Sequence, residues 1–211
     1  MHCKYCLNPQ SISSETEYHI LSSHELLEYL IKDELYYVAT DGGVAFGGGE
    51  PLLYGSYIEE VLELGASRWN TTIETSLNVP LKNFIRLFDY NVRFVVDVKD
   101  MTPSIYRDYT GCSCDHVIDN LKWIAKNKLT DKVSVRLPLI PNYNNEESLR
   151  QSRKELESMG FNDIVELTYI TNIKKYKNER KRAMQYSPCC TIKGGEPKRN
   201  HLSASCMHSS R

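Results

Sequence analysis

The sequence predicts an α/β fold in which one parallel sheet is covered by helices, and three observations support this. Five strand-like segments alternate with segments of helical periodicity along the chain, which is the pattern of βα units. The chain has 211 residues, a length that suits one domain with a sizeable core. Hydrophobic residues make up 41% of it, as in ordinary globular proteins. A barrel-like sheet and an open sheet both agree with this pattern.

The first predicted helix follows Ser22. Ser22 and Glu25 have the S-x-x-E spacing of a capping box, which satisfies backbone N–H groups at a helix start. The apolar residues that then recur on one helical face are Leu26, Leu27, Leu30 and Ile31. A short apolar strand at residues 44–46 comes next, and it runs directly into the glycines at 47–49.

A second capped helix is predicted from Ser56 and Glu59. Its apolar face would consist of Ile58, Val61 and Leu62. Gly65 is a natural end for this helix, because glycine readily adopts the left-handed conformation that closes many helices.

The alternation of strands and helices then continues to residue 169. The further predicted strands are 71–75, 94–98, 133–139 and 164–169. The intervening helices are marked by Leu81, Phe84, Ile85 and Phe88 after Pro80, by Val117, Leu121 and Ile124, and by Leu149 and Leu156. Residues 94–98 are apolar almost throughout, so we expect this strand to be buried on both faces.

The C-terminal segment differs from the rest of the chain. From Lys174 to Arg211 there are ten Lys and Arg residues and two acidic residues, whereas the net charge of the whole chain is −1. Because helical and strand periodicity also stops here, we expect 1–173 to form the domain and 174–211 a loosely ordered, solvated basic tail. The sequence contains neither an apolar run of membrane-spanning length nor a signal-peptide pattern.

Cys3 and Cys6 form a C-x-x-C motif near the start of the sequence. Seven cysteines spread over a chain of this length favour a reducing cytosol, with some cysteines as metal ligands, over a disulfide framework. The motif alone is compatible with a redox dithiol, half of a zinc site or part of an iron–sulfur site. A zinc site would need a second ligand pair, and Cys112, Cys114 and His116 have an unusual spacing for it.

The neighbouring residues make the resemblance more specific. Cys-Lys-Tyr-Cys-Leu-Asn-Pro at 3–9 resembles the second half of the C-x-x-x-C-x-aromatic-C signature of radical S-adenosylmethionine (SAM) enzymes. The Asn-Pro is typical of activating enzymes for glycyl radical enzymes, such as pyruvate formate-lyase activase. Residues 42–53 resemble that family's strand and glycine-rich GGEP motif. A second Gly-Gly-Glu-Pro at 194–197 follows Lys193 instead of a strand, and we interpret it as coincidence.

Further segments resemble the same family in the same order, and together they cover residues 1–172. They are Ile73–Asn78, Asp97–Lys99, Tyr109–Gly111 and Val135–Asn142, the last with Asn142 where glycine is usual. Several short motifs in register are stronger evidence than any one of them. The sequence departs from the family near the sixth strand, where Thr171 stands about where a histidine is expected.

The resemblance implies a partial (β/α)6 barrel, similar to a TIM barrel, with its site at the carboxyl ends of the strands. It also implies a [4Fe-4S] cluster on three cysteines, of which Cys3 and Cys6 are two. The third would lie two positions ahead of Met1, after the barrel's first strand. We therefore expect an N-terminally truncated chain that lacks this strand, and a two-thiolate site that holds the cluster poorly.

The resemblance and the residue types suggest roles around SAM. Gly48 and Gly49 would let the backbone approach the methionine part, because glycine has no Cβ. Glu50, or neighbouring carbonyl groups, would accept from its ammonium group. The backbone beside Tyr5 would meet the adenine.

Three charged residues are further candidates for holding SAM. Asp97 and Lys99 would grip the ribose and the carboxylate from one face of a strand end. Arg136 would offer its planar fork to a carboxylate. The structural alternatives are an internal ion pair for Asp97 and Lys99, and a purely structural role for Arg136.

The implied function is the activation of a glycyl radical enzyme in an anaerobic cytoplasm. Reductive cleavage of SAM would produce a 5′-deoxyadenosyl radical, which would take a hydrogen atom from a glycine Cα of the partner protein. A flavodoxin or ferredoxin would donate the electron, and we expect a monomer that binds neither nucleic acid nor membrane. The alternatives are a radical SAM enzyme for a small molecule and a truncated remnant without turnover.

Overall fold

The computed structural model describes residues 1–11, 19–168, 192–193 and 203–204. Its centre is a sheet in which five parallel strands follow one another in chain order. These strands are β2 (Gly43–Gly47), β3 (Asn70–Thr75), β4 (Val92–Asp97), β5 (Val133–Leu139) and β6 (Ile164–Thr168). The predicted α/β class and its five parallel strands are confirmed.

Three two-residue strands complete the described sheet. They are β1 (His19–Ile20), β7 (Ile192–Lys193) and β8 (Ser203–Ala204), in the order β1-β7-β8 beside β2. β8 pairs with β2 in the antiparallel direction. Apart from β7 and β8, the predicted basic tail lies outside the described residues. Among the described helices, none is both long and apolar enough to cross a membrane.

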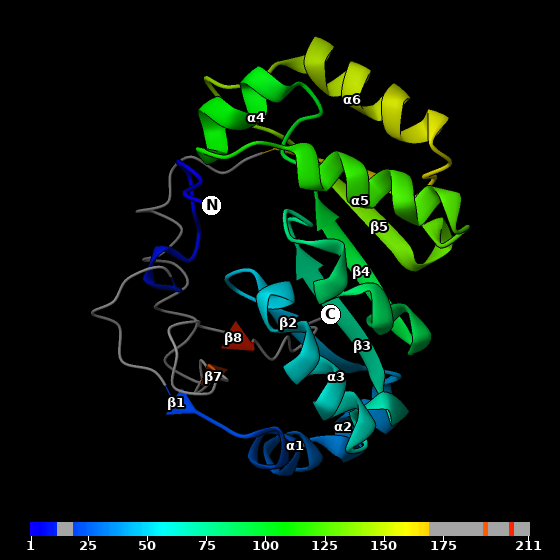
Figure 1. Cartoon of the computed structure of the whole chain (residues 1–211). Coiled ribbons are helices and arrows are strands. Elements are labelled where there is room, and N and C mark those ends of the chain that lie inside the picture. Colours follow the sequence, from blue (N-terminus) through cyan, green and yellow to red (C-terminus); the bar gives the residue numbers. More distant parts are fainter. Residues whose placement is uncertain (12–18, 169–191, 194–202, 205–211) are drawn as a thin grey trace.

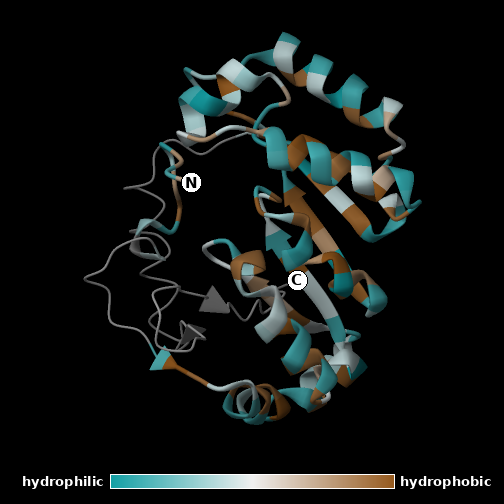
Figure 2. Ribbon diagram, viewed as in Figure 1, coloured by the Kyte–Doolittle hydropathy of each residue, from teal (hydrophilic) through white to brown (hydrophobic). Residues whose placement is uncertain are grey.

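The described α-helices lie before β2 in two cases and between successive parallel strands in the others. They are α1 (Ser23–Ile31), α2 (Glu34–Thr40), α3 (Gly55–Glu63), α4 (Pro103–Thr110), α5 (Asp115–Lys126) and α6 (Glu146–Ser158). In Figure 1, α5 and α6 lie on one side of the sheet, and the N-terminal segment lies on the other. Figure 2 shows hydrophobic colours along the central strands, whereas α6 is mostly hydrophilic. This pattern is expected when helices cover one face of a sheet.

The two faces of the sheet have different compositions. On β4, Phe94 and Val96 are completely buried, whereas the alternate residues Val95 and Asp97 are half-buried. The prediction that this strand is buried on both faces is therefore wrong for the second face. Side chains alternate along a strand, so these half-buried positions form a second face that carries charged groups. That face holds the site.

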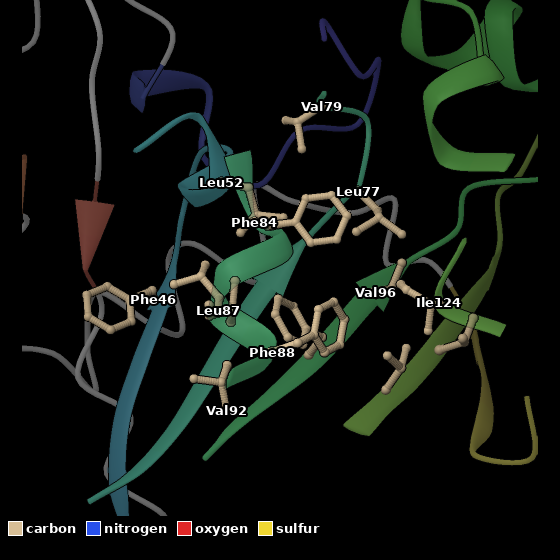
Figure 3. Close-up of a cluster of buried hydrophobic side chains, with 14 of the residues drawn as sticks. Phe46, Leu52, Leu77, Val79, Phe84, Leu87, Phe88, Val92, Val96 and Ile124 are labelled. Atoms are coloured by element: carbon tan, nitrogen blue, oxygen red, sulfur yellow. The ribbon is translucent and has the colours of Figure 1, made fainter. Parts of the chain in front are cut away.

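Aromatic residues between β3 and β4 fill the core on the helix-covered face. Phe84, Leu87 and Phe88 point onto the sheet (Figure 3), and the rings of Phe88 and Phe94 are 4.5 Å apart. The sequence predicts one α-helix after Pro80, but the structure has two 3₁₀ helices, η4 (Leu81–Asn83) and η5 (Ile85–Asp89). The backbone of Phe84 causes the break, because its φ of −139° is not helical.

The helix ends agree with the predictions in part. Ser22 caps α1, and the reciprocal bonds between Ser22 and Glu25 form the predicted capping box. The second predicted box does not cap α3, because α3 already starts at Gly55 and Ser56 lies inside it. Glu59 instead forms an ion pair with Arg86 at 2.8 Å. The sequence patterns do not predict α2 or α4.

We expect Gly55→Ala to destabilise the fold, although alanine normally favours a helix. A Cβ on Gly55 would lie 1.6 Å from the carbonyl oxygen of Asn83, so the backbone of η4 would have to move. Overpacking of this kind costs about 3 kcal/mol of unfolding free energy. Urea denaturation measures it, with the exposed neighbouring change Ser56→Ala as the control. Equal stability of the two variants would contradict the close approach.

Candidate active site

A cavity of about 520 Å³ opens on the polar face of the sheet, at the carboxyl ends of its strands. Its walls come from the N-terminal segment, the loops after β2, β3 and β4, and side chains on one face of β3, β4 and β5. The residues that line it are Met1, Cys3, Cys6, Leu7, Asn8, Ser11, Gly48, Gly49, Glu50, Leu53, Glu74, Thr75, Ser76, Asn78, Asp97, Lys99 and Arg136. Eight of the nine predicted site residues therefore surround one space, and Tyr5 is the exception.

Backbone hydrogen bonds hold the N-terminal cysteine segment (residues 1–9) at the end of α4. The N–H groups of His2 and Lys4 donate to the carbonyl oxygens of Thr110 (2.9 Å) and Tyr109 (3.2 Å). The last carbonyls of a helix have no partner within the helix, so the segment satisfies two of them. Cys3 lies between these two bonds. Burial raises the pKa of its thiol above the ordinary value, and the positive charge of Lys99 opposes this shift.

The glycine loop after β2 forms another wall of the cavity. Gly48 has a φ of 101°, which a side chain would strain. Its carbonyl oxygen accepts from Nδ2 of Asn8 at 3.2 Å, so the loop is tied to the cysteine segment. Gly49 differs, because a Cβ there would lie 3.7 Å from Oγ of Ser11, which is an ordinary contact. The cavity side of Gly49 is therefore open.

Glu50 connects the glycine loop to the end of β3. Its carboxylate accepts hydrogen bonds from the backbone N–H groups of Leu52 (3.2 Å) and Ser76 (2.9 Å). It also accepts from the hydroxyls of Thr75 (2.6 Å) and Ser76 (2.5 Å). The structure therefore gives Glu50 a positioning task that the sequence did not reveal.

Two ion pairs lie on the cavity face of the sheet. Lys99 contacts Asp97 at 3.2 Å, and Arg136 contacts Glu74 at 3.0 Å. Arg136 stands on β5 and Glu74 on β3, so the guanidinium reaches across β4 between them. The long planar fork of arginine suits such a span. Both cations are thus held in place at the wall of the cavity.

Tyr5 does not line the cavity with its side chain. Its ring packs against the rings of Tyr109 and Tyr143, at centroid distances of 6.2 and 5.9 Å. Its hydroxyl accepts from Nδ2 of Asn142 at 3.2 Å.

Several lining residues had no predicted role. Asn8, Glu74, Thr75, Ser76 and Asn78 all fall inside motifs that the sequence shares with the family. The motifs thus indicate which segments of the chain line the cavity. The individual contacts depend on how β3, β4 and β5 lie beside one another.

A metal ligand set is only partly present among the described residues. Cys3 and Cys6 face the same cavity, but no group of three or more His, Cys, Asp or Glu side chains in the described segments is arranged to hold a metal ion. Two thiols are fewer than the three or four thiolates that hold a [4Fe-4S] cluster. The described residues alone therefore do not fit a [4Fe-4S] cluster, although the cavity beside them has the polar groups that a zwitterionic ligand needs.

The remaining candidate ligands do not extend this set. Cys114 is buried at the start of α5, and Cys112 is half-buried. His116 is exposed. The described residues therefore contain no zinc site that joins these three residues to Cys3 and Cys6. Thr171 and the second Gly-Gly-Glu-Pro lie outside the described residues.

The chain has clear similarities to known proteins. It is 34% identical over 127 residues to the (2S)-3-sulfopropanediol dehydratase activating enzyme of Klebsiella oxytoca. The matched region covers 60% of this chain and 39% of that protein. It is 28% identical over 142 residues to the 4-hydroxyphenylacetate decarboxylase activating enzyme of Clostridium scatologenes. This second match covers 67% of this chain and 45% of that protein. The chain thus spans less than half of the length of these relatives.

Solved structures share the fold. A domain of the pyruvate-formate lyase-activating enzyme from Bacteroides vulgatus matches with a TM-score of 0.53 at 19% identity, over 74% of this chain and 99% of that chain. SuiB of Streptococcus suis bound to S-adenosylmethionine matches with a TM-score of 0.58 at 14% identity, over 88% of this chain and 43% of that chain. The Radical SAM superfamily profile matches residues 1–150. The family resemblance predicted from the motifs is confirmed, and the chain belongs to the radical SAM superfamily.

Proposed function

We propose that this chain forms the SAM-binding body of an activating enzyme for a glycyl radical enzyme. The observation that carries the proposal is the convergence of the cysteine segment, the glycine loop and the charged strand ends around one cavity. The names of its relatives support the same activity, because they are activating enzymes for a dehydratase and a decarboxylase. The proposed partner is thus a protein with a glycine that becomes a radical.

The residues of this chain would bind and orient SAM. Gly48 and Gly49 would admit the methionine part, and Lys99 or Arg136 would meet its carboxylate while Asp97 holds the ribose. Because Lys99 and Arg136 are already paired with acids, they stay in place before the ligand arrives. A [4Fe-4S] cluster on Cys3, Cys6 and one further thiolate would supply the electron for SAM cleavage. The 5′-deoxyadenosyl radical from SAM would then take the hydrogen atom from the glycine Cα.

The experiment is anaerobic reconstitution of a chain extended upstream of Met1, together with the candidate glycyl radical enzyme. We expect 5′-deoxyadenosine after reduction, and a glycyl radical signal by electron paramagnetic resonance. Formation of 5′-deoxyadenosine without a glycyl radical would favour the small-molecule alternative. The absence of both a [4Fe-4S] spectrum and 5′-deoxyadenosine would overturn the enzyme proposal.

Gly49→Ala tests the SAM site separately from the chemistry. A Cβ at Gly49 makes ordinary contacts with Ser11, so we expect the variant to unfold at the same urea concentration as the parent. The methyl group would nevertheless stand in the cavity, where the backbone has to approach SAM. We expect SAM affinity to fall about tenfold by equilibrium dialysis, which is about 1.4 kcal/mol. Unchanged affinity would show that the glycine loop does not contact SAM.

A further inference from the structure

The cysteine segment is held on two sides, and the second side is not explained by any motif. On one side, α4 receives the N–H groups of His2 and Lys4. On the other side stands the loop after β5, from which Asn142 and Tyr143 reach Tyr5. Tyr5 is two residues from Cys3 and next to Cys6, so any restraint on its ring also restrains both thiols.

Three tyrosine rings form a closed cluster at this contact. The centroids of Tyr5, Tyr109 and Tyr143 are 5.1 to 6.2 Å apart, and all three pairs are tilted or edge-on. These are the favourable arrangements for aromatic pairs. Tyr109 is buried, so the cluster is anchored in α4. Tyr5 enters it from the cysteine segment and Tyr143 from the loop after β5.

Asn142 adds a polar contact to this cluster. Its φ of 69° lies in the left-handed region, which explains why glycine is usual at this place in the motif. Asparagine is one of the few residues with a side chain that adopt this conformation readily. Unlike glycine, it also has an amide group, whose Nδ2 donates to the Tyr5 hydroxyl at 3.2 Å.

The loop that carries Asn142 and Tyr143 is itself fixed to the sheet. Asn144 Oδ1 accepts from the N–H of Ile140 at 2.5 Å, and its Nδ2 donates to the carbonyl oxygen of Pro138 at 2.9 Å. Nδ2 of Asn144 also reaches Oδ2 of the buried Asp100 at 3.3 Å, just after β4. A loop anchored in this way can hold another segment in a defined place.

We propose that Tyr143 and Asn142 are positioning residues that hold the Cys3–Cys6 segment at the cavity through the side chain of Tyr5. The inference rests on the proposed function for the role of the two thiols, but the contacts themselves do not depend on SAM. Tyr143 acts through its ring and Asn142 through its amide. Neither residue lines the cavity, so neither is a catalytic residue.

The test measures how fast Cys3 and Cys6 react with an alkylating reagent in the reduced, metal-free chain, peptide by peptide. We expect Tyr143→Leu to raise both rates about tenfold, equivalent to about 1.4 kcal/mol of local opening. Tyr143→Phe keeps the ring and should restore the parent rates. Asn142→Gly keeps the backbone conformation and loses one hydrogen bond, so we expect it to raise both alkylation rates about threefold.

Val61→Ala provides the control for a general loss of stability. Val61 is completely buried in α3, away from the cysteine segment, so this change weakens the whole fold. Rates that are unchanged in Tyr143→Leu, or that rise no more than in Val61→Ala, would overturn the proposal. Because the assay needs neither cluster nor SAM, its outcome is separate from that of the activase experiment.

Discussion

Glu50→Ala is expected to destabilise the chain by about 3 kcal/mol and to weaken SAM binding at the same time. The carboxylate of Glu50 accepts four hydrogen bonds, from Leu52, Thr75 and Ser76. Hydrogen bonds to a charged group contribute about 1.5–3 kcal/mol each, and they are not additive within one network. Water that enters the cavity would replace some of them, which is why the expected loss is well below their sum.

The effect of Glu50→Ala on binding follows from what Glu50 connects. Through Leu52 it holds the turn after Gly48 and Gly49, and through Ser76 it holds the loop after β3. Both segments line the cavity, so they would lose their common support. Glu50→Gln keeps the shape of the side chain but turns an amide nitrogen toward hydrogen-bond donors. We expect it to lower the free energy of unfolding by about 2 kcal/mol.

The measurements for Glu50 are urea denaturation and equilibrium dialysis with SAM. Glu60→Gln serves as the control, because Glu60 accepts one hydrogen bond, from Ser23 at 2.7 Å, on the exposed side of α3. We expect Glu60→Gln to lower the free energy of unfolding by less than about 1 kcal/mol. If Glu50→Gln and Glu60→Gln had equal stabilities, the carboxylate of Glu50 would not be the connector that its contacts indicate.

Much of the sheet was predictable because its strands carry a local signal. The apolar residues of β5 recur at alternate positions over a segment of strand length, and the observed bounds of β5 are those predicted. The region after Pro80 was not predictable in the same way. Its apolar spacing fits a helix, but the backbone breaks at Phe84, where Phe84 and Phe88 pack against each other and against Phe94 of β4.

The site residues were predictable as members of motifs, but their partners were not. Asp97 and Lys99 are two positions apart on one strand end, so their contact follows from strand geometry. The contact of Arg136 with Glu74 joins β5 to β3 across β4, and it requires the strand order. The support of Tyr5 by Tyr143 likewise joins residues 138 positions apart.

The loop after β3 holds a strained residue near the cavity. Leu77 has a φ of 58°, which is unusual for a residue with a side chain, and its neighbours Ser76 and Asn78 line the cavity. Asn120 on α5 stabilises this loop, because its Nδ2 donates to the carbonyl oxygens of Leu77 (2.9 Å) and Val79 (2.8 Å). Strained backbone persists where surrounding contacts enforce it.

Asn120→Asp is therefore expected to cost about 4 kcal/mol of unfolding free energy at pH 7. Asn120 is 3% exposed, and the change replaces a buried donor by an acceptor that faces two carbonyl oxygens. Asn127→Asp is a matched control on α5, since Nδ2 of Asn127 donates to one exposed carbonyl oxygen, that of Trp123. We expect that control to lose about 1 kcal/mol or less.

The pH dependence distinguishes this cause from a general packing defect. Burial and the facing carbonyls would raise the pKa of the new carboxyl group above its unfolded value of about 3.9. The protonated form can still donate one hydrogen bond, so the variant should approach the parent below about pH 4 and lose stability as the pH rises through the folded-state pKa. Urea denaturation from pH 4 to 7 measures this difference. A constant difference between Asn120→Asp and the parent across that range would show that the amide protons of Asn120 do not hold the loop after β3.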